Sequence, residues 1–84
     1  MKMYLVLAVF QSFDVPLSLY PDIEAARVHA HKVHGMGKEE LQRFLDHHLG
    51  GILPVPAAED YEGVRLLIFE DGTPVDAEEV APNV

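Results

Sequence analysis

The first clear pattern in the chain is an unbroken apolar run over residues 3–10, MYLVLAVF. A run of β-favouring side chains like this is typical of a strand covered on both faces, so we expect the central strand of a sheet here. Residues 15–20 alternate apolar and polar positions, which predicts a second, short strand. Pro16 cannot donate a ladder hydrogen bond, and it therefore restricts that segment to a sheet edge or an extended lead-in.

Two amphipathic helices are predicted in the middle of the chain. The first is expected over residues 21–34, because Pro21 suits the first helical position and Gly35 is a natural left-handed stop. The second is expected over residues 37–49, with acids in its first turn, histidines in its last turn and two glycines beyond. A proline-interrupted loop follows over residues 52–62.

The last part of the chain predicts a β-hairpin. Residues 63–70 form another apolar run, and the Asp71-Gly72 pair is a strong turn signal before a short strand over residues 73–76. Residues 77–84 are acidic, and we expect them to be a frayed tail. Residues 1–76 are therefore expected to be a single α+β domain in the order β-β-α-α-β-β. Its two helices should pack on one face of a small antiparallel sheet of three to four strands.

Charge is distributed unequally along the 84 residues, which carry a net charge of −8. Residues 1–58 are nearly neutral, whereas residues 59–84 hold eight acids against Arg65 alone. An acidic field repels phosphate backbones, so we expect no direct binding of DNA or RNA. Acidic proteins of phages and mobile elements can mimic nucleic acid, but this net charge is modest for a mimic. Acids also simply keep a small apolar protein soluble.

Length and composition also limit the location and the kind of site. One domain of this length has room for one core, so a ligand site must lie on its surface or between subunits. The sequence has no 18-residue apolar run, which predicts that it does not span a membrane. It has no cysteine, which fits a reducing compartment, and we expect a cytoplasmic location.

The stretch HAHKVHG, residues 29–35, raises the question of a metal site. At about 100° per residue, His29 and His34 flank the apolar stripe of the first predicted helix on opposite sides, and His31 points to solvent. Only His31 and His34 are spaced to hold one ion together, whereas a structural zinc ion normally has four ligands. We therefore predict no metal and no cofactor, and keep a histidine-based metal or small-ligand binding protein as the alternative.

His48 lies on the apolar stripe of the second predicted helix, so its imidazole is expected at the core or its margin. It can be a hydrogen-bonded packing residue at a helix C-terminus. The alternative is a ligand-binding or pH-sensing group beneath residues 50–62, acting as a general base beside Tyr20, Asp14 or Tyr61. Because no nucleophile, base and acid are paired in the sequence, we predict that the protein is not an enzyme. A small enzyme with a site at His48 is the last alternative.

The strongest functional signal is an excess of apolar surface. Both faces of the strands predicted over 3–10 and 63–70 are apolar, whereas two short helices can cover only one face of the sheet. The other face is left to the loop 52–62 or to another chain. We predict a cytoplasmic adaptor or inhibitor that binds a partner protein, or forms a homodimer, through an apolar sheet face with an acidic rim. The residues predicted for this patch are Tyr4, Val6, Phe10, Leu67 and Phe69.

Overall fold

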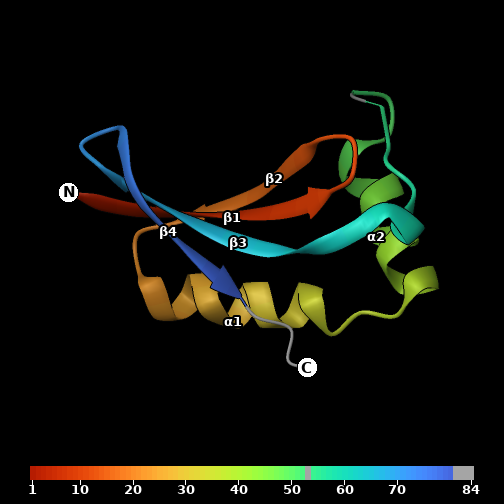
Figure 1. Cartoon of the computed structure of the whole chain (residues 1–84), viewed down its shortest axis with the longest axis horizontal. Coiled ribbons are helices and arrows are strands. Elements are labelled where there is room, and N and C mark those ends of the chain that lie inside the picture. Colours follow the sequence, from red (N-terminus) through yellow and green to blue (C-terminus); the bar gives the residue numbers. More distant parts are fainter. Residues whose placement is uncertain (53, 81–84) are drawn as a thin grey trace.

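The protein, described by a computed structural model over residues 1–52 and 54–80, has one antiparallel sheet of four strands in the order β2-β1-β3-β4. The helix α1 runs along one side of this sheet, and α2 lies at one end of it (Figure 1). The predicted fold class and element order are confirmed. The elements are β1 (Lys2–Phe10), β2 (Asp14–Tyr20), α1 (Ile23–His34), α2 (Lys38–Leu49), the short 3₁₀ helix η1 (Ala58–Asp60), β3 (Tyr61–Glu70) and β4 (Thr73–Val80).

The strand β1 is central, as its unbroken apolar run predicts, because it pairs with β2 on one side and β3 on the other. The strand β2 is an edge strand, in agreement with the prediction from Pro16. The predicted turn between β3 and β4 is also confirmed. Asp71 and Gly72 have φ angles of 51° and 86°, the left-handed values that a tight hairpin of this kind needs at both positions.

The helix ends differ in detail from the prediction. The helix α1 begins at Ile23 rather than at residue 21, because Asp22 is its N-cap and the Asp22 carboxylate accepts a hydrogen bond from the Ala25 N–H at 3.1 Å. Gly35 ends this helix, but the prediction of a left-handed stop is wrong. Gly35 has φ −83°, and its N–H still donates to the His31 carbonyl at 3.0 Å, as in a continuing helical turn.

The strand β4 is longer than predicted. Residues 77–80 were expected to belong to a frayed tail, but they continue the ladder with β3, and Val80 pairs with Val64. Two ion pairs explain why this acidic segment stays in the sheet. Glu78 accepts hydrogen bonds from Arg27 of α1, and Glu79 accepts one from Arg65 of β3. The rest of the predicted tail, residues 81–84, lies outside the described residues.

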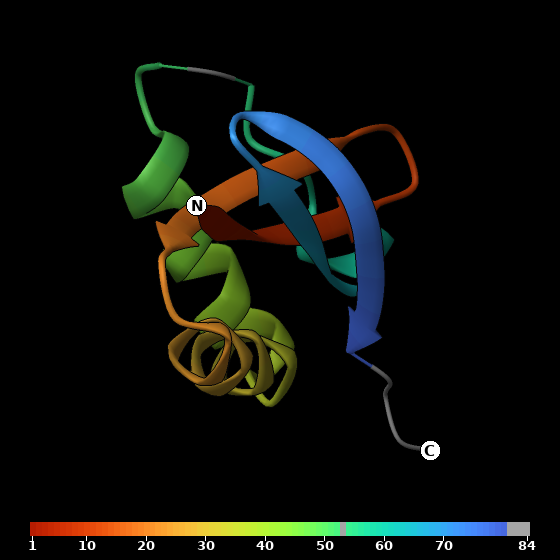
Figure 2. The same ribbon diagram turned by 90° about the vertical axis from the view of Figure 1, so that its left-hand side faces the viewer.

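The core lies between the sheet and the two helices, and Figure 2 shows α1 end-on beneath the sheet. Its strand residues include Val6, Ala8, Phe10, Val64 and Leu66, and its helix residues include Ala26, Ala30, Val33, Leu41, Leu45 and Leu49.

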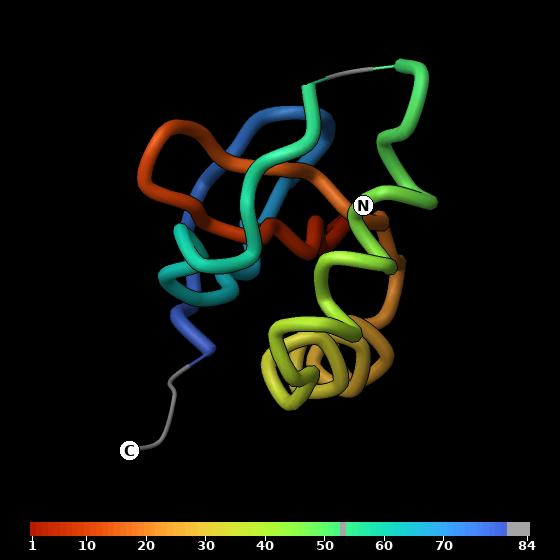
Figure 3. The backbone as a smooth tube through the Cα atoms, turned by 90° about the vertical axis from the view of Figure 1, so that its right-hand side faces the viewer, coloured from red at the N-terminus to blue at the C-terminus, as the bar shows by residue number. Residues whose placement is uncertain are grey.

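The loop after α2 packs on this same core side. It runs from the end of α2 back to the start of β3 (Figure 3). Val55 and Ala58 pack in the helix-side core, and Pro56 is buried. The Gln42 side chain of α2 holds the loop, because it accepts a hydrogen bond from the Ala58 N–H at 2.8 Å and donates one to the Pro56 carbonyl at 3.2 Å.

Candidate functional site

The sheet has a second apolar face, on the side opposite the core. Side chains alternate along each strand, so the residues between the core residues of β1 and β3 point away from α1. The ladder places Met3 opposite Phe69 and Leu5 opposite Leu67 on that side. Leu19 of β2 pairs with Leu5, and Ala77 of β4 pairs with Leu67. We call this surface the open face, and it consists of Met3, Leu5, Leu7, Val9, Leu19, Leu67, Phe69 and Ala77.

The open face is hollowed near the β3–β4 turn. Met3, Leu5, Leu19, Phe69 and Gly72 line a hollow of about 280 Å³. This is just below the range in which small-molecule pockets usually begin, about 300 Å³, so its size suits a large apolar side chain. Leu19 stands at its edge with 53% of its surface exposed, and Met3, Leu5 and Phe69 are half-buried.

A charged pair, Arg65 and Glu79, lies on the same side of the sheet as the open face. Arg65 lies opposite Leu7 in the ladder, and its Nε donates to the Glu79 carboxylate on the neighbouring strand at 2.7 Å. Cross-strand pairs of opposite charge stabilise a sheet modestly. The guanidinium group of Arg65 is therefore already paired with a carboxylate of the same chain.

The patch predicted from the sequence is divided between the two faces of the sheet. Leu67 and Phe69 lie on the open face, but the prediction is wrong for Tyr4, Val6 and Phe10. Val6 and Phe10 are 0% and 3% exposed and belong to the core, against which Tyr4 packs. The reason is the register, because Val6 pairs with the core residue Leu66 rather than with a residue of the open face.

Six residues of the open face were missing from the predicted patch: Met3, Leu5, Leu7, Val9, Leu19 and Ala77. Alternation divides each strand into two sets of residues, but the pairing between strands must be known before one set can be assigned to the core. Val64 and Leu66 of β3 belong to the core between the sheet and the helices. Val6 of β1 pairs with Leu66, so every second residue of β1 counted from Val6 faces the core. The residues between them face the open side of the sheet.

The three histidines of α1 are placed as the helical periodicity predicts, and two of them are hydrogen-bonded across the fold. His29 Nδ1 lies 2.6 Å from Ser18 Oγ and 3.0 Å from Tyr20 OH, both on β2. On the other side of the helix, His34 Nδ1 lies 2.6 Å from Tyr61 OH. His31 is exposed. Burial lowers the pKa of His29, with smaller contributions from Lys32 and His48, and burial raises the pKa of Tyr61 to about 12.

His48 is half-buried at the margin of the core, as predicted. Its Nε2 lies 3.3 Å from the Pro16 carbonyl oxygen, to which it donates, and its ring stacks on Phe44 with the centroids 5.7 Å apart. Two of the three partners proposed for a base at this position are engaged elsewhere, since Tyr20 bonds to His29 and Tyr61 bonds to His34. The contacts of His48 therefore fasten α2 to the edge strand β2.

Ser18 and His29 lie as close together as a nucleophile and its base, a pairing that was not predicted from the sequence. The surroundings do not supply the rest of such a site. The hollow beside His29 is lined by Tyr20, Ala25, Val28, His29 and Lys32, and not by Ser18. Tyr20 competes with Ser18 for the same ring nitrogen. We therefore interpret this cluster as a link between β2 and α1.

Two further observations concern metal ligands and membrane-spanning helices. Within residues 1–52 and 54–80, no three histidine, aspartate or glutamate side chains come together as metal ligands would. No helix in the same residues is both long enough and apolar enough to cross a membrane.

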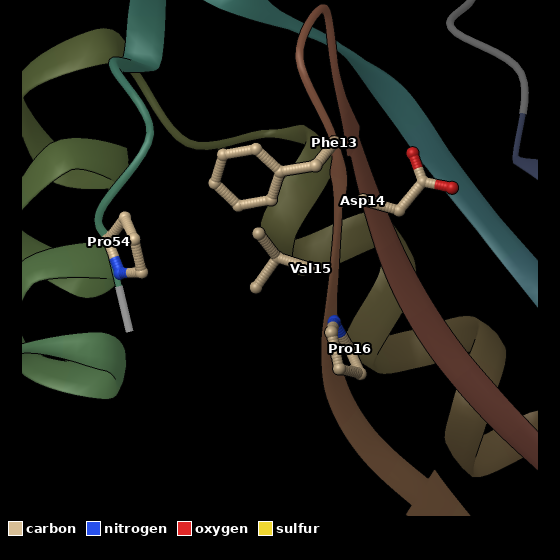
Figure 4. A pocket seen from close by; sticks show the side chains of 5 residues that line it. All are labelled: Phe13, Asp14, Val15, Pro16 and Pro54. Atoms are coloured by element: carbon tan, nitrogen blue, oxygen red, sulfur yellow. The ribbon is translucent and has the colours of Figure 1, made fainter. Parts of the chain in front are cut away.

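A third hollow, of about 240 Å³, lies at the turn between β1 and β2. Figure 4 shows the side chains of Phe13 and Val15 pointing across it towards Pro54, while Asp14 points away. Pro16 completes its lining.

The fold and its surfaces define a small α+β domain with one apolar sheet face outside the core. Comparison with protein families, with curated proteins and with solved structures finds no match for this chain. Its function must therefore be argued from its own residues.

Proposed function

We propose that the protein is an interaction module, of the adaptor or inhibitor kind, that acts by binding another protein chain through the open face. The observation that carries this proposal is the apolar hollow formed by residues of β1, β2 and β3 on that face. Contiguous apolar surface of this kind marks protein-binding sites more often than it marks free surface. Large apolar side chains withdrawn from water contribute roughly 1.5–3 kcal/mol each, which gives the face a strong tendency to be covered.

The size of the face fits a protein rather than a small molecule. Its four strands have seven to ten residues each. With about 4.8 Å between strands and about 3.3 Å per residue, such a face covers on the order of 500 Å². Two faces in contact bury roughly 1,000 Å², which is about the smallest area of a specific protein interface.

The occupant that we propose is a second copy of this chain. A two-fold axis through the open face would let the exposed Leu19 of each copy enter the hollow of the other, since the hollow and Leu19 are adjacent. Arg65 and Glu79 form an ion pair within each chain, so the charge of Arg65 stays paired with an acid when two copies meet. A target protein would then act by replacing the second copy.

The test is sedimentation velocity of the wild type and of Leu19→Lys between about 1 and 100 μM, a range that covers micromolar dissociation constants. We expect the wild type to dimerise and Leu19→Lys to remain a monomer with a nearly unchanged melting temperature. The side chain of Leu19 is already half-exposed, so the lysine costs the folded monomer little.

The matched control is Val28→Lys, which introduces the same charge at a residue of α1 that is 69% exposed, away from the open face. This variant should dimerise like the wild type. A wild type that stays monomeric throughout would overturn the second copy as occupant. A Leu19→Lys variant that still dimerises would show that another surface mediates the contact.

A further inference from the structure

A second surface feature lies along α1, separate from the open face. Ala25, Val28, His29 and Lys32 are three or four residues apart and form one stripe of the helix. Together with Tyr20 at the end of β2 they line a shallow hollow of about 480 Å³, which we call the α1 hollow. Its volume lies within the range of about 300–1,000 Å³ that is usual for small-molecule sites.

The α1 hollow is lined by a cation, Lys32, although the whole chain is acidic. The charges that act on His29 come from Lys32 and His48, and both oppose its protonation. The two acids at the start of α1, Asp22 and Glu24, are engaged elsewhere. Glu24 pairs with Arg27, which also binds Glu78 on the far edge of the sheet. Asp22 accepts a hydrogen bond from the Ala25 N–H as the N-cap of the helix.

The hydrogen bonds of His29 leave a donor for a ligand. A neutral imidazole has one nitrogen that accepts and one that donates. Ser18 Oγ and Tyr20 OH both approach Nδ1, at 2.6 Å and 3.0 Å, which favours Nδ1 as the acceptor and places the ring proton on Nε2. No hydrogen bond to Nε2 is found among the described residues, so its N–H is left for a molecule in the hollow.

We propose that the α1 hollow binds a small organic oxyanion, that is, a phosphate or carboxylate group carried on a small apolar group. The oxyanion lies between the Lys32 ammonium group and the His29 Nε2–H. The apolar group packs on Ala25, Val28 and the Tyr20 ring. The charged contact and the apolar lining are both needed, because one exposed ammonium group by itself holds an anion weakly.

The test is a titration of the ¹⁵N-labelled protein with phenyl phosphate, followed by amide chemical shifts. We expect saturable shifts at residues 20 and 25–32, with a dissociation constant on the order of 1 mM, as suits a shallow site. Inorganic phosphate supplies the oxyanion alone and benzyl alcohol the apolar group alone, and each should bind at least about threefold more weakly.

Lys32→Gln should weaken phenyl phosphate binding about two- to fivefold, the usual size of an exposed charged contact. Lys38→Gln removes the same charge from the exposed first turn of α2 and should leave the affinity unchanged. The proposal fails if no residue of the α1 hollow responds, or if Lys32→Gln and Lys38→Gln behave alike. It also fails if benzyl alcohol binds as tightly as phenyl phosphate, which would make the hollow an apolar site. None of these results depends on whether the open face binds a second copy.

Discussion

At the scale of single residues, two histidines hold the edge strand β2 against the helices. His29 of α1 bonds to the hydroxyl groups of Ser18 and Tyr20, and His48 of α2 donates to the Pro16 carbonyl. The two bonds differ in their response to a proton. Nε2 of His48 donates whether its ring is neutral or charged, whereas Nδ1 of His29 loses its acceptor lone pair when it is protonated.

This difference predicts how stability depends on pH. Burial lowers the pKa of His29, so the unfolded chain binds a proton more readily than the folded one. The contribution of the neutral ring is complete above the unfolded pKa of about 6.5 and is lost as the pH falls through the lower folded value. The charged groups that face His29 are Lys32 on its own helix and His48 on α2, while β2 contributes the two hydroxyl groups.

We expect His29→Gln to lower the free energy of unfolding by about 1 kcal/mol at pH 7, the usual contribution of such hydrogen bonds. It should also flatten the decline in stability between pH 7 and pH 5, as measured by urea denaturation. His31→Gln is the matched control, because His31 is exposed on the same helix. A decline equally steep in His29→Gln and in the wild type would show that the neutral state of His29 does not matter for folding.

At the scale of secondary-structure elements, the strand β4 depends on a contact with α1. Arg27 donates from Nε and from Nη2 to the two carboxylate oxygens of Glu78, both at 2.8 Å. Hydrogen bonds from Arg27 lower the pKa of Glu78, and those with Glu78 raise the pKa of Arg27. A bidentate pair of this kind fixes the relative orientation of the two side chains as well as their distance. It therefore determines where the last residues of β4 lie over α1.

Glu78→Gln should therefore loosen the end of β4. We expect amide hydrogen exchange at residues 77–80 to become about two- to fivefold faster, while β1 keeps its protection, because the pair is partly exposed and contributes modestly. Glu79→Gln is the control, since the Glu79 carboxylate bonds to Arg65 within the sheet and not to α1. Equal acceleration in both variants would mean that acidic charge in general, and not the Arg27 contact, holds the strand.

The elements also show what could be predicted from the sequence. Periodicity, Pro16 and the Asp71-Gly72 turn were enough to predict the order of strands and helices along the chain, because each of these signals is local. The sequence does not reveal which face of β1 meets the helices, because its two faces are equally apolar and a shift of one residue exchanges them. The extension of β4 and the His29 cluster depend on contacts between residues distant in the sequence, such as Arg27 with Glu78, which local spacing does not reveal.

At the scale of the whole molecule, the net charge of −8 opposes the proposed pairing of two copies. Salt shortens the range of this repulsion, from about 10 Å at 0.1 M to about 3 Å at 1 M. We therefore expect the dissociation constant of the dimer, measured by sedimentation equilibrium, to fall about two- to tenfold between 50 and 500 mM NaCl. A dimer that weakens over this range would mean that complementary charges, rather than the apolar open face, hold the two copies together.

The two prolines at the margins of the sheet limit how large an assembly can become. Pro16 lies in β2 and Pro74 in β4, the two outer strands, and neither can donate a main-chain hydrogen bond to an added strand. The carbonyl group of Pro16 is in addition already used by His48. Growth strand by strand into fibrils is thus obstructed at both margins. Contact through one face, in contrast, uses up that face once two molecules have met, so the pairing that we propose would stop at a dimer and would not continue into a polymer.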